Sequence, residues 1–231
     1  MLITSAHSGE GKSHTAANLA VSFAQLGQTV LLIDADLRRP TLHLRFSMIN
    51  HSGLIDIIER GTEWRSVLQD TDMENLKVLP TGGLPYNPAE LLSTKRMQSL
   101  LESLKGVFDI IIVDAPIALS IPDVAILVRD IDAVLLVHYP VKSEREAAME
   151  TKRTLDRAGA NLLGIVFNNV KSNMCPYYYH HQLYPQYPDE LLVSKQQRQR
   201  STTFVDMRPS ENQEKWTAIS QHSHQHTPHS S

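Results

Sequence analysis

A short loop near the start of the chain carries residues suited to binding phosphate. A brief apolar run leads to Gly9 and Gly11, and Lys12, Ser13 and a helical pattern follow. Glycines at these positions let backbone N–H groups turn toward an anion, and the helix N-terminus adds positive potential. In such a loop the lysine reaches the β- and γ-phosphates and the serine hydroxyl ligates Mg²⁺. The spacing predicts a phosphate loop, although Ala6 replaces the first glycine of the strict pattern; the alternative is a glycine-containing turn before an ordinary helix.

Three aspartates stand at the ends of predicted strands. Asp34 and Asp36 directly follow one apolar run, and Asp114 ends another. Strand alternation puts Asp34 and Asp36 on the same side of the backbone, where they could hold Mg²⁺ with its water shell. Either of them could accept a proton from an attacking hydroxyl, and Asp114 would be a second metal anchor. Each aspartate alone could be a turn residue, but together with the loop they predict a magnesium–nucleotide site.

Two asparagines, Asn168 and Asn169, end the last predicted strand. A carboxamide offers a donor and an acceptor to a purine edge, and the alternative is that these residues simply form a turn. We predict that Mg²⁺ is held by Ser13, Asp36 and Asp114. The predicted nucleotide-binding residues are Gly9, Glu10, Gly11, Lys12, Ser13, His14 and Asn168.

The elements that must position these residues follow an α/β pattern. Four apolar runs, at 29–33, 109–113, 133–137 and 162–167, lack alternation, which suits strands covered on both faces of a parallel sheet. Helical patterns separate the runs, and the first spans His14 to Leu26 with Gly27 at a left-handed cap position. This succession predicts a doubly wound, mostly parallel sheet with helices on both faces. Its ligand site would lie at the carboxyl ends of the strands.

A longer insertion separates the second run from the third. Two short helical patterns, around Leu54 to Glu59 and Glu63 to Leu68, and a small strand, Leu76 to Leu79, lie within it. We expect this insertion to form a surface flap. The sequence after it, from Asn87 to Glu90, predicts a helix start with Asn87 as N-cap, and the helix runs toward Leu104 in two pieces broken near Ser93.

The overall composition narrows the classes of partner. The 231 residues carry a formal charge of -3 and a pI near 6.4, so there is no basic field of the kind that nucleic-acid binding requires. The single cysteine, Cys175, excludes an intrachain disulfide framework and suits a reducing cytosol. No apolar run approaches the length of a membrane span, and no signal peptide is evident. We therefore expect a soluble, cytoplasmic protein.

The C-terminal quarter of the chain has a different composition. We place the folded domain at residues 1–170, a tyrosine-rich segment at 171–193 and a polar tail at 194–231. The tail is rich in Gln, Ser, Thr and His, and such a composition cannot offset the entropy of ordering, so we expect disorder there. The tyrosines, which could instead form an aromatic patch on the domain, are Tyr177, Tyr178, Tyr179, Tyr184 and Tyr187.

Three segments together resemble the Walker-type motifs of bacterial tyrosine kinases, a family that serves capsule and exopolysaccharide synthesis. These are Thr4–Ser13, Leu32–Pro40 and Phe108–Pro116. Leu79–Leu92 is similar to the proline-rich segment of the family, and Gly164–Asn168 also matches. The resemblance covers about residues 2 to 170. His14 stands where the family commonly has threonine.

The resemblance implies a function. Lys12 and Ser13 would bind ATP and magnesium, Asp36 or Asp34 would help deprotonate a tyrosine, and Asp114 would support the metal. Because these kinases phosphorylate tyrosines in their own C-terminal segment, the cluster at 177–187 would be the phosphoacceptor, presented in trans by a neighbouring chain. The expected partner is a membrane adaptor of the chain-length-determinant type with a cytoplasmic activating segment, which could recruit the chain to the inner face of the membrane.

Two other functions remain open at this point. A plasmid-partition or septum-placement ATPase shares the general motif layout, but such proteins place a signature lysine five residues before the loop lysine, where this chain has His7. The other alternative is a nucleotide-binding module without turnover, acting as an assembly subunit in polysaccharide export.

Overall fold

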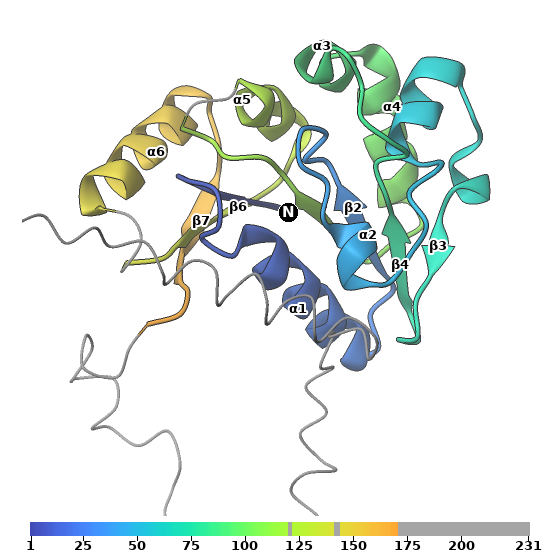
Figure 1. Cartoon of the computed structure of the whole chain (residues 1–231), viewed down its shortest axis with the longest axis horizontal. Coiled ribbons are helices and arrows are strands. Elements are labelled where there is room, and N and C mark those ends of the chain that lie inside the picture. Colours follow the sequence, from blue (N-terminus) through green and yellow to red (C-terminus); the bar gives the residue numbers. More distant parts are fainter. Residues whose placement is uncertain (120–121, 141–143, 171–231) are drawn as a thin grey trace, which may run out of the picture.

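A seven-stranded sheet organises the part of the chain that the computed structural model describes, residues 1–119, 122–140 and 144–170 (Figure 1). The predicted tyrosine segment and tail, 171–231, lie outside the described residues. The strands are β1 (Leu2–Ser5), β2 (Val30–Asp34), β3 (Gln69–Asp70), β4 (Leu76–Leu79), β5 (Ile110–Asp114), β6 (Val134–His138) and β7 (Leu162–Phe167). The α-helices are α1 (Lys12–Gln25), α2 (Leu42–Arg45), α3 (Pro88–Leu92), α4 (Lys95–Lys105), α5 (Asp123–Leu127) and α6 (Arg145–Arg157).

The strand order is β3-β4-β2-β5-β1-β6-β7. Every pair is parallel except β3 with β4, so the predicted mostly parallel sheet is confirmed. β1 lies between β5 and β6, and the chain winds outward from it in both directions. The loop after β1 therefore opens at the middle of the carboxyl edge, where doubly wound sheets bind ligands.

Helices cover both faces of the sheet, and each face has its own apolar core (Figure 1). On one face α1 packs its alanines, including Ala16 and Ala20, against Ile3 of β1 and Leu32 of β2. The other core contains residues from α4, α5 and α6 together with Leu2, Leu31 and Val113 of the sheet. The strands at the middle of the sheet are therefore covered on both sides, as their continuous apolar runs predict.

The prediction of a surface flap between β2 and β5 is wrong. β4 lies inside the sheet between β2 and β3, and its Leu76, Val78 and Leu79 are buried. The helical segment before it, which contains a π-helical turn at Asp56–Arg60, buries Leu54 in the core. Ile55, Ile57 and Ile58 of the same segment are also buried in this core, so the segment is part of the folded domain and not a flap over it.

Close backbone packing holds this segment to the loop after β4. Leu54 N–H donates to the Pro80 carbonyl at 2.8 Å, and Ile55 N–H donates to the Thr81 carbonyl at 2.9 Å. A Cβ on Gly53 would lie 2.1 Å from the Pro80 oxygen, so only glycine permits this approach. The contact explains why a residue without a side chain stands at the start of the segment.

The second half of the insertion agrees with the predicted helix boundaries. Asn87 is the N-cap of α3, Pro88 is its first residue, and the Asn87 amide donates to Glu90 at 3.0 Å. α3 ends at Leu92 and α4 begins at Lys95, which confirms the break near Ser93. Thr94 caps α4, since its hydroxyl accepts from the Met97 N–H at 3.3 Å.

β7 departs from the prediction of a strand covered on both faces. It is an edge strand, and its side chains alternate between partly buried and exposed, with Leu163 at 57 % and Phe167 at 60 % exposure. Its pairing with β6 contains an irregularity, because Val134 pairs with Leu162 while Leu135 pairs with Gly164. An apolar run alone does not separate an edge strand from a central one.

None of the described helices combines the length and the apolar character needed to cross a lipid bilayer.

Candidate nucleotide-binding site

The predicted phosphate loop connects β1 to α1 at the middle of the sheet. Gly9 and Gly11 have φ values of 78° and 99°, a region that L-residues with side chains rarely occupy. A Cβ on Gly11 would also lie 2.0 Å from the side-chain amide nitrogen of Asn168, so a side chain here would displace that amide from its hydrogen bond to the Glu10 carbonyl. α1 then starts at Lys12, and its N-terminal end faces the loop.

A buried carboxylate inside the loop ties it to the neighbouring strands. Glu10 is fully buried, and its carboxylate accepts from the His7 N–H at 2.7 Å and from the Tyr139 N–H at 3.2 Å. Nδ1 of His138, the last residue of β6, lies 3.3 Å from the same carboxylate. The Asn168 amide donates to the Glu10 carbonyl at 2.9 Å. Glu10 was predicted only as a member of the loop, and no sequence signal marks it as the residue that fixes the loop to β6 and β7.

Lys12 faces the strand-end aspartates. Its Nζ lies 2.7 Å from Asp36 Oδ2 and 3.6 Å from Asp114 Oδ1, and it lies 3.3 Å from the Ser13 hydroxyl. Burial alone would lower the pKa of Lys12, but the attraction of Asp114 and Asp36 outweighs it and raises that pKa. The lysine therefore stays charged and near the place where the loop would hold phosphate.

Asp34 and Asp114 lie side by side at the ends of neighbouring strands, since their Cα positions pair across β2 and β5. Both side chains are fully buried. Burial, strengthened by the charge of Asp114, raises the pKa of Asp34 to about 7, and burial likewise raises the pKa of Asp114. Asp34 Oδ2 accepts from the N–H groups of Thr41 and Leu42, at 3.0 and 2.9 Å. These bonds use one carboxylate oxygen and fix the side chain to the start of α2.

The aspartates have unfilled acceptor capacity. Asp34 Oδ1 and both carboxylate oxygens of Asp114 are buried without a hydrogen bond of normal geometry among the described residues, although Asp114 attracts the Lys12 ammonium at 3.6 Å and the nearby Ser13 hydroxyl. Such atoms are costly unless something binds them. The described residues offer no cluster of three or more His, Cys, Asp or Glu side chains that would form an all-protein metal cage. Mg²⁺ usually takes one or two carboxylates and completes its shell with water and phosphate, so the residues present fit that ion.

The loop after β2 is fixed from two sides. Asp36 is 5 % exposed, and its Oδ1 accepts from the Arg39 N–H at 3.0 Å. Arg38 forms a forked ion pair with the buried Asp123 of α5, with contacts of 2.9 and 3.0 Å. A bidentate pair of this kind restricts the loop in orientation as well as in distance. Arg38 was not predicted as a site residue, although it directly follows the aspartate pair in the sequence.

The short helix α2 was missed by the sequence analysis, and it contributes to the site. The Arg45 Nη1 lies 3.5 Å from Nδ1 of His14, the third residue of α1. Burial, together with the positive charge of Arg45, lowers the pKa of His14. A helix of four residues has too few apolar positions to show a helical period. The only sequence signal for its role in the site is a basic residue, Arg45, shortly after the aspartate pair.

The structure brings together most of the predicted site residues. Gly9, Glu10, Gly11, Lys12, Ser13, Asp34, Asp36 and Asp114 meet at the carboxyl edge of the sheet. Asn168 lies against the loop with its amide N–H directed to Glu10, and its contact with a purine stays a prediction. His14 begins the exposed side of α1. The predicted phosphoacceptor tyrosines lie outside the described residues.

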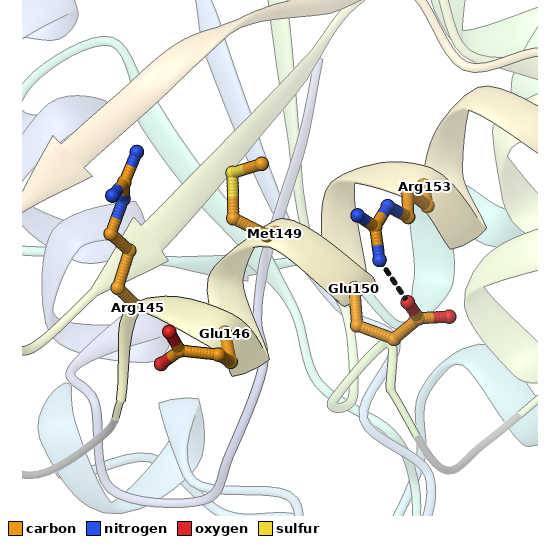
Figure 2. Close-up of a pocket in the computed structure, with 5 residues that line it drawn as sticks. All are labelled: Arg145, Glu146, Met149, Glu150 and Arg153. Carbon is orange, nitrogen blue, oxygen red and sulfur yellow. Dashed lines mark hydrogen bonds and ion pairs between the residues drawn. The ribbon is translucent and has the colours of Figure 1, made fainter.

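A hollow of about 390 Å³ lies elsewhere, on the outer face of α6 (Figure 2). The lining residues that belong to the described part of the chain all come from α6. Two of them, Arg153 and Glu150, form an ion pair at 3.1 Å along the helix (Figure 2). No residue of the phosphate loop takes part, so this hollow is not the candidate site. Its lining is Arg145, Glu146, Met149, Glu150 and Arg153.

Comparisons with known proteins agree with this geometry. A family model described as an AAA domain matches residues 1–152. The tyrosine-protein kinase YwqD of Bacillus subtilis is 43 % identical over 171 residues, which cover 74 % of this chain and 72 % of YwqD.

Solved structures give the same result. The kinase domain of the Escherichia coli tyrosine kinase ETK superposes with a TM-score of 0.69 at 33 % identity, covering 74 % of this chain and 68 % of that one. The septum site-determining protein MinD of Pyrococcus horikoshii, complexed with Mg-ADP, is more distant, with a TM-score of 0.61 and 25 % identity over 72 % of this chain and 68 % of that one. The closer likeness is to kinases, which confirms the kinase interpretation over the septum-placement ATPase. The chain belongs to the bacterial tyrosine-protein kinase family and is a protein-tyrosine kinase with a nucleotide-binding P-loop fold.

Proposed function

We propose that this kinase uses ATP and Mg²⁺ to phosphorylate the tyrosines of its own C-terminal cluster. One observation carries the proposal: Lys12 of a glycine loop lies against the buried carboxylates of Asp36 and Asp114, and Asp34 stands beside Asp114 on the neighbouring strand. Asp34 and Asp114 have oxygens without a hydrogen-bond partner among the described residues. The loop amides suit the phosphates, and the acids suit the metal that accompanies them. An ordinary turn would not bury such a set of charges.

The loop and the acids then divide the binding of phosphate and metal. Backbone N–H groups of Gly9 to Ser13 and the Lys12 ammonium bind the phosphates and hold the terminal one in position. The Ser13 hydroxyl and the carboxylates of Asp36 and Asp114 hold Mg²⁺, which supplies positive charge near the transferred group. Phosphoryl transfer depends mainly on such positioning and charge neutralisation.

Asp36 is the stronger candidate for accepting the tyrosine proton. Asp34 is fully buried and already accepts two backbone N–H groups, whereas Asp36 lies next to the lysine on the loop that faces the site. Its Oδ2 would take the proton of the attacking hydroxyl once Lys12 turns toward phosphate. Asp34 would instead hold the start of α2 and support the charge of the metal site.

The phosphoacceptors we propose are Tyr177, Tyr178, Tyr179, Tyr184 and Tyr187, presented in trans by a neighbouring chain. The resemblance to capsule and exopolysaccharide kinases supports a role in the synthesis of such polymers. It also supports a chain-length-determinant membrane adaptor as the partner, and a cytoplasmic location at the inner face of the membrane. Each phosphorylated tyrosine adds a charge of roughly -1.5 to -2, which would favour separation of neighbouring subunits.

The decisive experiment is incubation of the full chain with Mg·ATP, followed by phosphotyrosine detection and mass spectrometry of the 177–187 segment. We expect phosphate on these tyrosines in the wild type and its loss in Lys12→Ala and Asp36→Ala. Lys152→Ala is the matched control, because Lys152 is an exposed residue of α6 that pairs with Asp156. Retained labelling in Asp36→Ala would exclude Asp36 as an essential base. Wild-type protein that binds ATP but leaves all five tyrosines unmodified, with or without a membrane-adaptor segment, would contradict the proposal.

A further inference from the structure

Buried polar atoms without a partner gather around the candidate site. Among the residues that the structure describes, every such side-chain atom belongs either to Asp34 and Asp114 or to the α2 segment. The carboxylate oxygens are accounted for by the proposed metal site. The metal site does not account for the buried polar atoms of the α2 segment that lack a hydrogen bond among the described residues. These atoms are Thr41 Oγ1, His43 Nδ1 and Arg45 Nε.

Arg45 is the charged member of this set. It is half-buried at the end of α2, and Asp34, which accepts from the Leu42 N–H at 2.9 Å, anchors the start of the same helix to the site. Its Nη1 lies 3.5 Å from Nδ1 of His14, one residue beyond Ser13. The guanidinium is therefore next to the first turn of α1, whose N-terminal end faces the phosphate loop.

The surroundings of Arg45 supply charge but no close acceptor for Nε. Burial lowers the pKa of Arg45, and the negative charges of Asp114 and Asp34 act in the opposite direction. These carboxylates thus attract the guanidinium, but among the described residues neither forms a direct hydrogen bond with it. A buried donor left in this way costs free energy, which binding of an acceptor would recover.

A phosphate group is a suitable acceptor for the Arg45 guanidinium, whose Nε has no hydrogen-bond partner among the described residues. The guanidinium presents its N–H groups as a planar fork that matches two phosphate oxygens. The N-terminal end of α1 attracts anions to the same place. The His14 ring lies beside the guanidinium, with Nδ1 at 3.5 Å from Nη1, and can hold it in orientation.

We propose that Arg45 is a further phosphate-binding residue, which donates to phosphate oxygens of the nucleotide held on the Gly9–Ser13 loop while His14 orients its guanidinium. The inference rests on the proposed ATP-binding function and adds a second cation beside Lys12. It also gives α2 a task, since the helix carries this cation to the loop. The alternative is a structural role, in which Arg45 only packs against α1 and complements the C-terminal end of α2.

The test compares Arg45→Gln and Arg45→Lys with wild type in three measurements on the full chain. These are the dissociation constant of Mg·ATP, the competition constant of inorganic triphosphate, and the melting temperature without ligand. Arg153→Gln on α6 removes the same charge from an exposed residue that pairs with Glu150, and it serves as the control.

We expect Arg45→Gln to weaken both Mg·ATP and inorganic triphosphate by about tenfold or more, the effect of losing a charge-assisted hydrogen bond. Arg45→Lys should recover part of the loss, because it keeps the charge and loses the fork. Arg153→Gln should bind as wild type does.

Two outcomes would overturn the inference while leaving the proposed function intact. One is unchanged binding of both ligands in Arg45→Gln. The other is a lower melting temperature with unchanged inorganic triphosphate binding, which would assign Arg45 a structural role. If wild-type protein itself failed to bind Mg·ATP, the proposed function would fail first, so the two failures are distinguishable.

Discussion

At the scale of single residues, the site places like charges where water cannot screen them. Asp34 and Asp114 are adjacent and fully buried, and Asp36 is nearly so, with Lys12 as the cation in direct contact. Without a bound cation this arrangement lowers the stability of the folded chain, since buried charges are tolerated only when paired. The raised pKa of Asp34 is the direct sign of that cost.

The first prediction concerns Asp34 and pH. Its folded pKa of about 7 lies above the ordinary value of 3.8, so the stabilising contribution is complete below the unfolded pKa and is lost as the pH rises through about 7. Asp34→Asn keeps an oxygen for the N–H groups of Thr41 and Leu42 and removes the charge. Between pH 5 and 8, the free energy of unfolding of the ligand-free wild type, measured in urea, should fall by roughly 3 kcal/mol more than that of the variant. If the free energies of unfolding of the two proteins changed equally with pH, Asp34 would already be ionised in the folded chain at pH 5, and the prediction would be wrong.

The second prediction concerns Glu10 as a positioning residue. Glu10→Ala leaves the part-buried N–H groups of His7 and Tyr139 without their acceptor, which costs about 1 kcal/mol for each. The loop should loosen, so we expect KM for ATP to rise about tenfold or more, with a smaller change in kcat. Glu10→Gln retains one acceptor oxygen and should recover part of the effect. Glu102→Ala, on an exposed residue of α4 that pairs with Lys105, is the control, and equal KM values in all variants would remove Glu10 from this role.

At the scale of elements, the sequence predicts the strands that have long apolar runs and misses the short elements, such as α2 and the place of β4 in the sheet. Continuous apolar runs identify β2, β5 and β6 correctly, because burial on both faces leaves no alternation to misinterpret. Motif spacing places Gly9, Lys12, Asp36 and Asp114 together, since the carboxyl ends of neighbouring parallel strands share one edge.

The missed features depend on contacts between distant segments. β4 was assigned to a surface flap because four residues between loops do not show which strand they will pair with. The exposed face of β7 follows from its position at the edge, which composition does not encode. The roles of Glu10 and Arg45 depend on Tyr139, His138 and His14 in space, and no local pattern contains those neighbours.

The third prediction tests the packing of the segment between β2 and β4. A Cβ at Gly53 would lie 2.1 Å from the Pro80 oxygen and 2.7 Å from the Gly82 nitrogen, both backbone atoms that cannot move cheaply. Gly53→Ala should therefore destabilise the chain by about 3 kcal/mol in urea unfolding. Gly106→Ala is the matched control, because its Cβ would meet its nearest neighbour at 3.9 Å with a helical backbone. A neutral Gly53→Ala would mean that this segment can move away from the sheet without cost.

At the scale of the whole molecule, the site lies where the two halves of the sheet meet. β1 leads into the phosphate loop, β2 and β5 supply the acids on one side, and β6 and β7 hold Glu10 from the other. A ligand that bridges the loop and the acids therefore contacts both halves. Binding should stabilise the entire sheet and not only the loop.

The fourth prediction is a thermal shift with ligand. At a Mg·ATP concentration of about 100 times its dissociation constant, stabilisation should reach about 2.7 kcal/mol. For a domain of this size that corresponds to a rise in Tm of roughly 5–10 °C, measured by calorimetry. Lys12→Ala should show little or no rise, and Lys152→Ala should respond as wild type does. A full shift in Lys12→Ala would contradict the proposed nucleotide site.

The contact between Lys12 and Asp36 at 2.7 Å has a consequence for the order of binding. Each of these groups already neutralises the other, so a phosphate that draws the ammonium away leaves a carboxylate uncompensated, and a cation that takes the carboxylate leaves an ammonium uncompensated. Only when both ligands arrive do both groups regain a partner. The free protein is thus built to prefer the metal–nucleotide complex over either component, and the affinity for each should increase when the other is present.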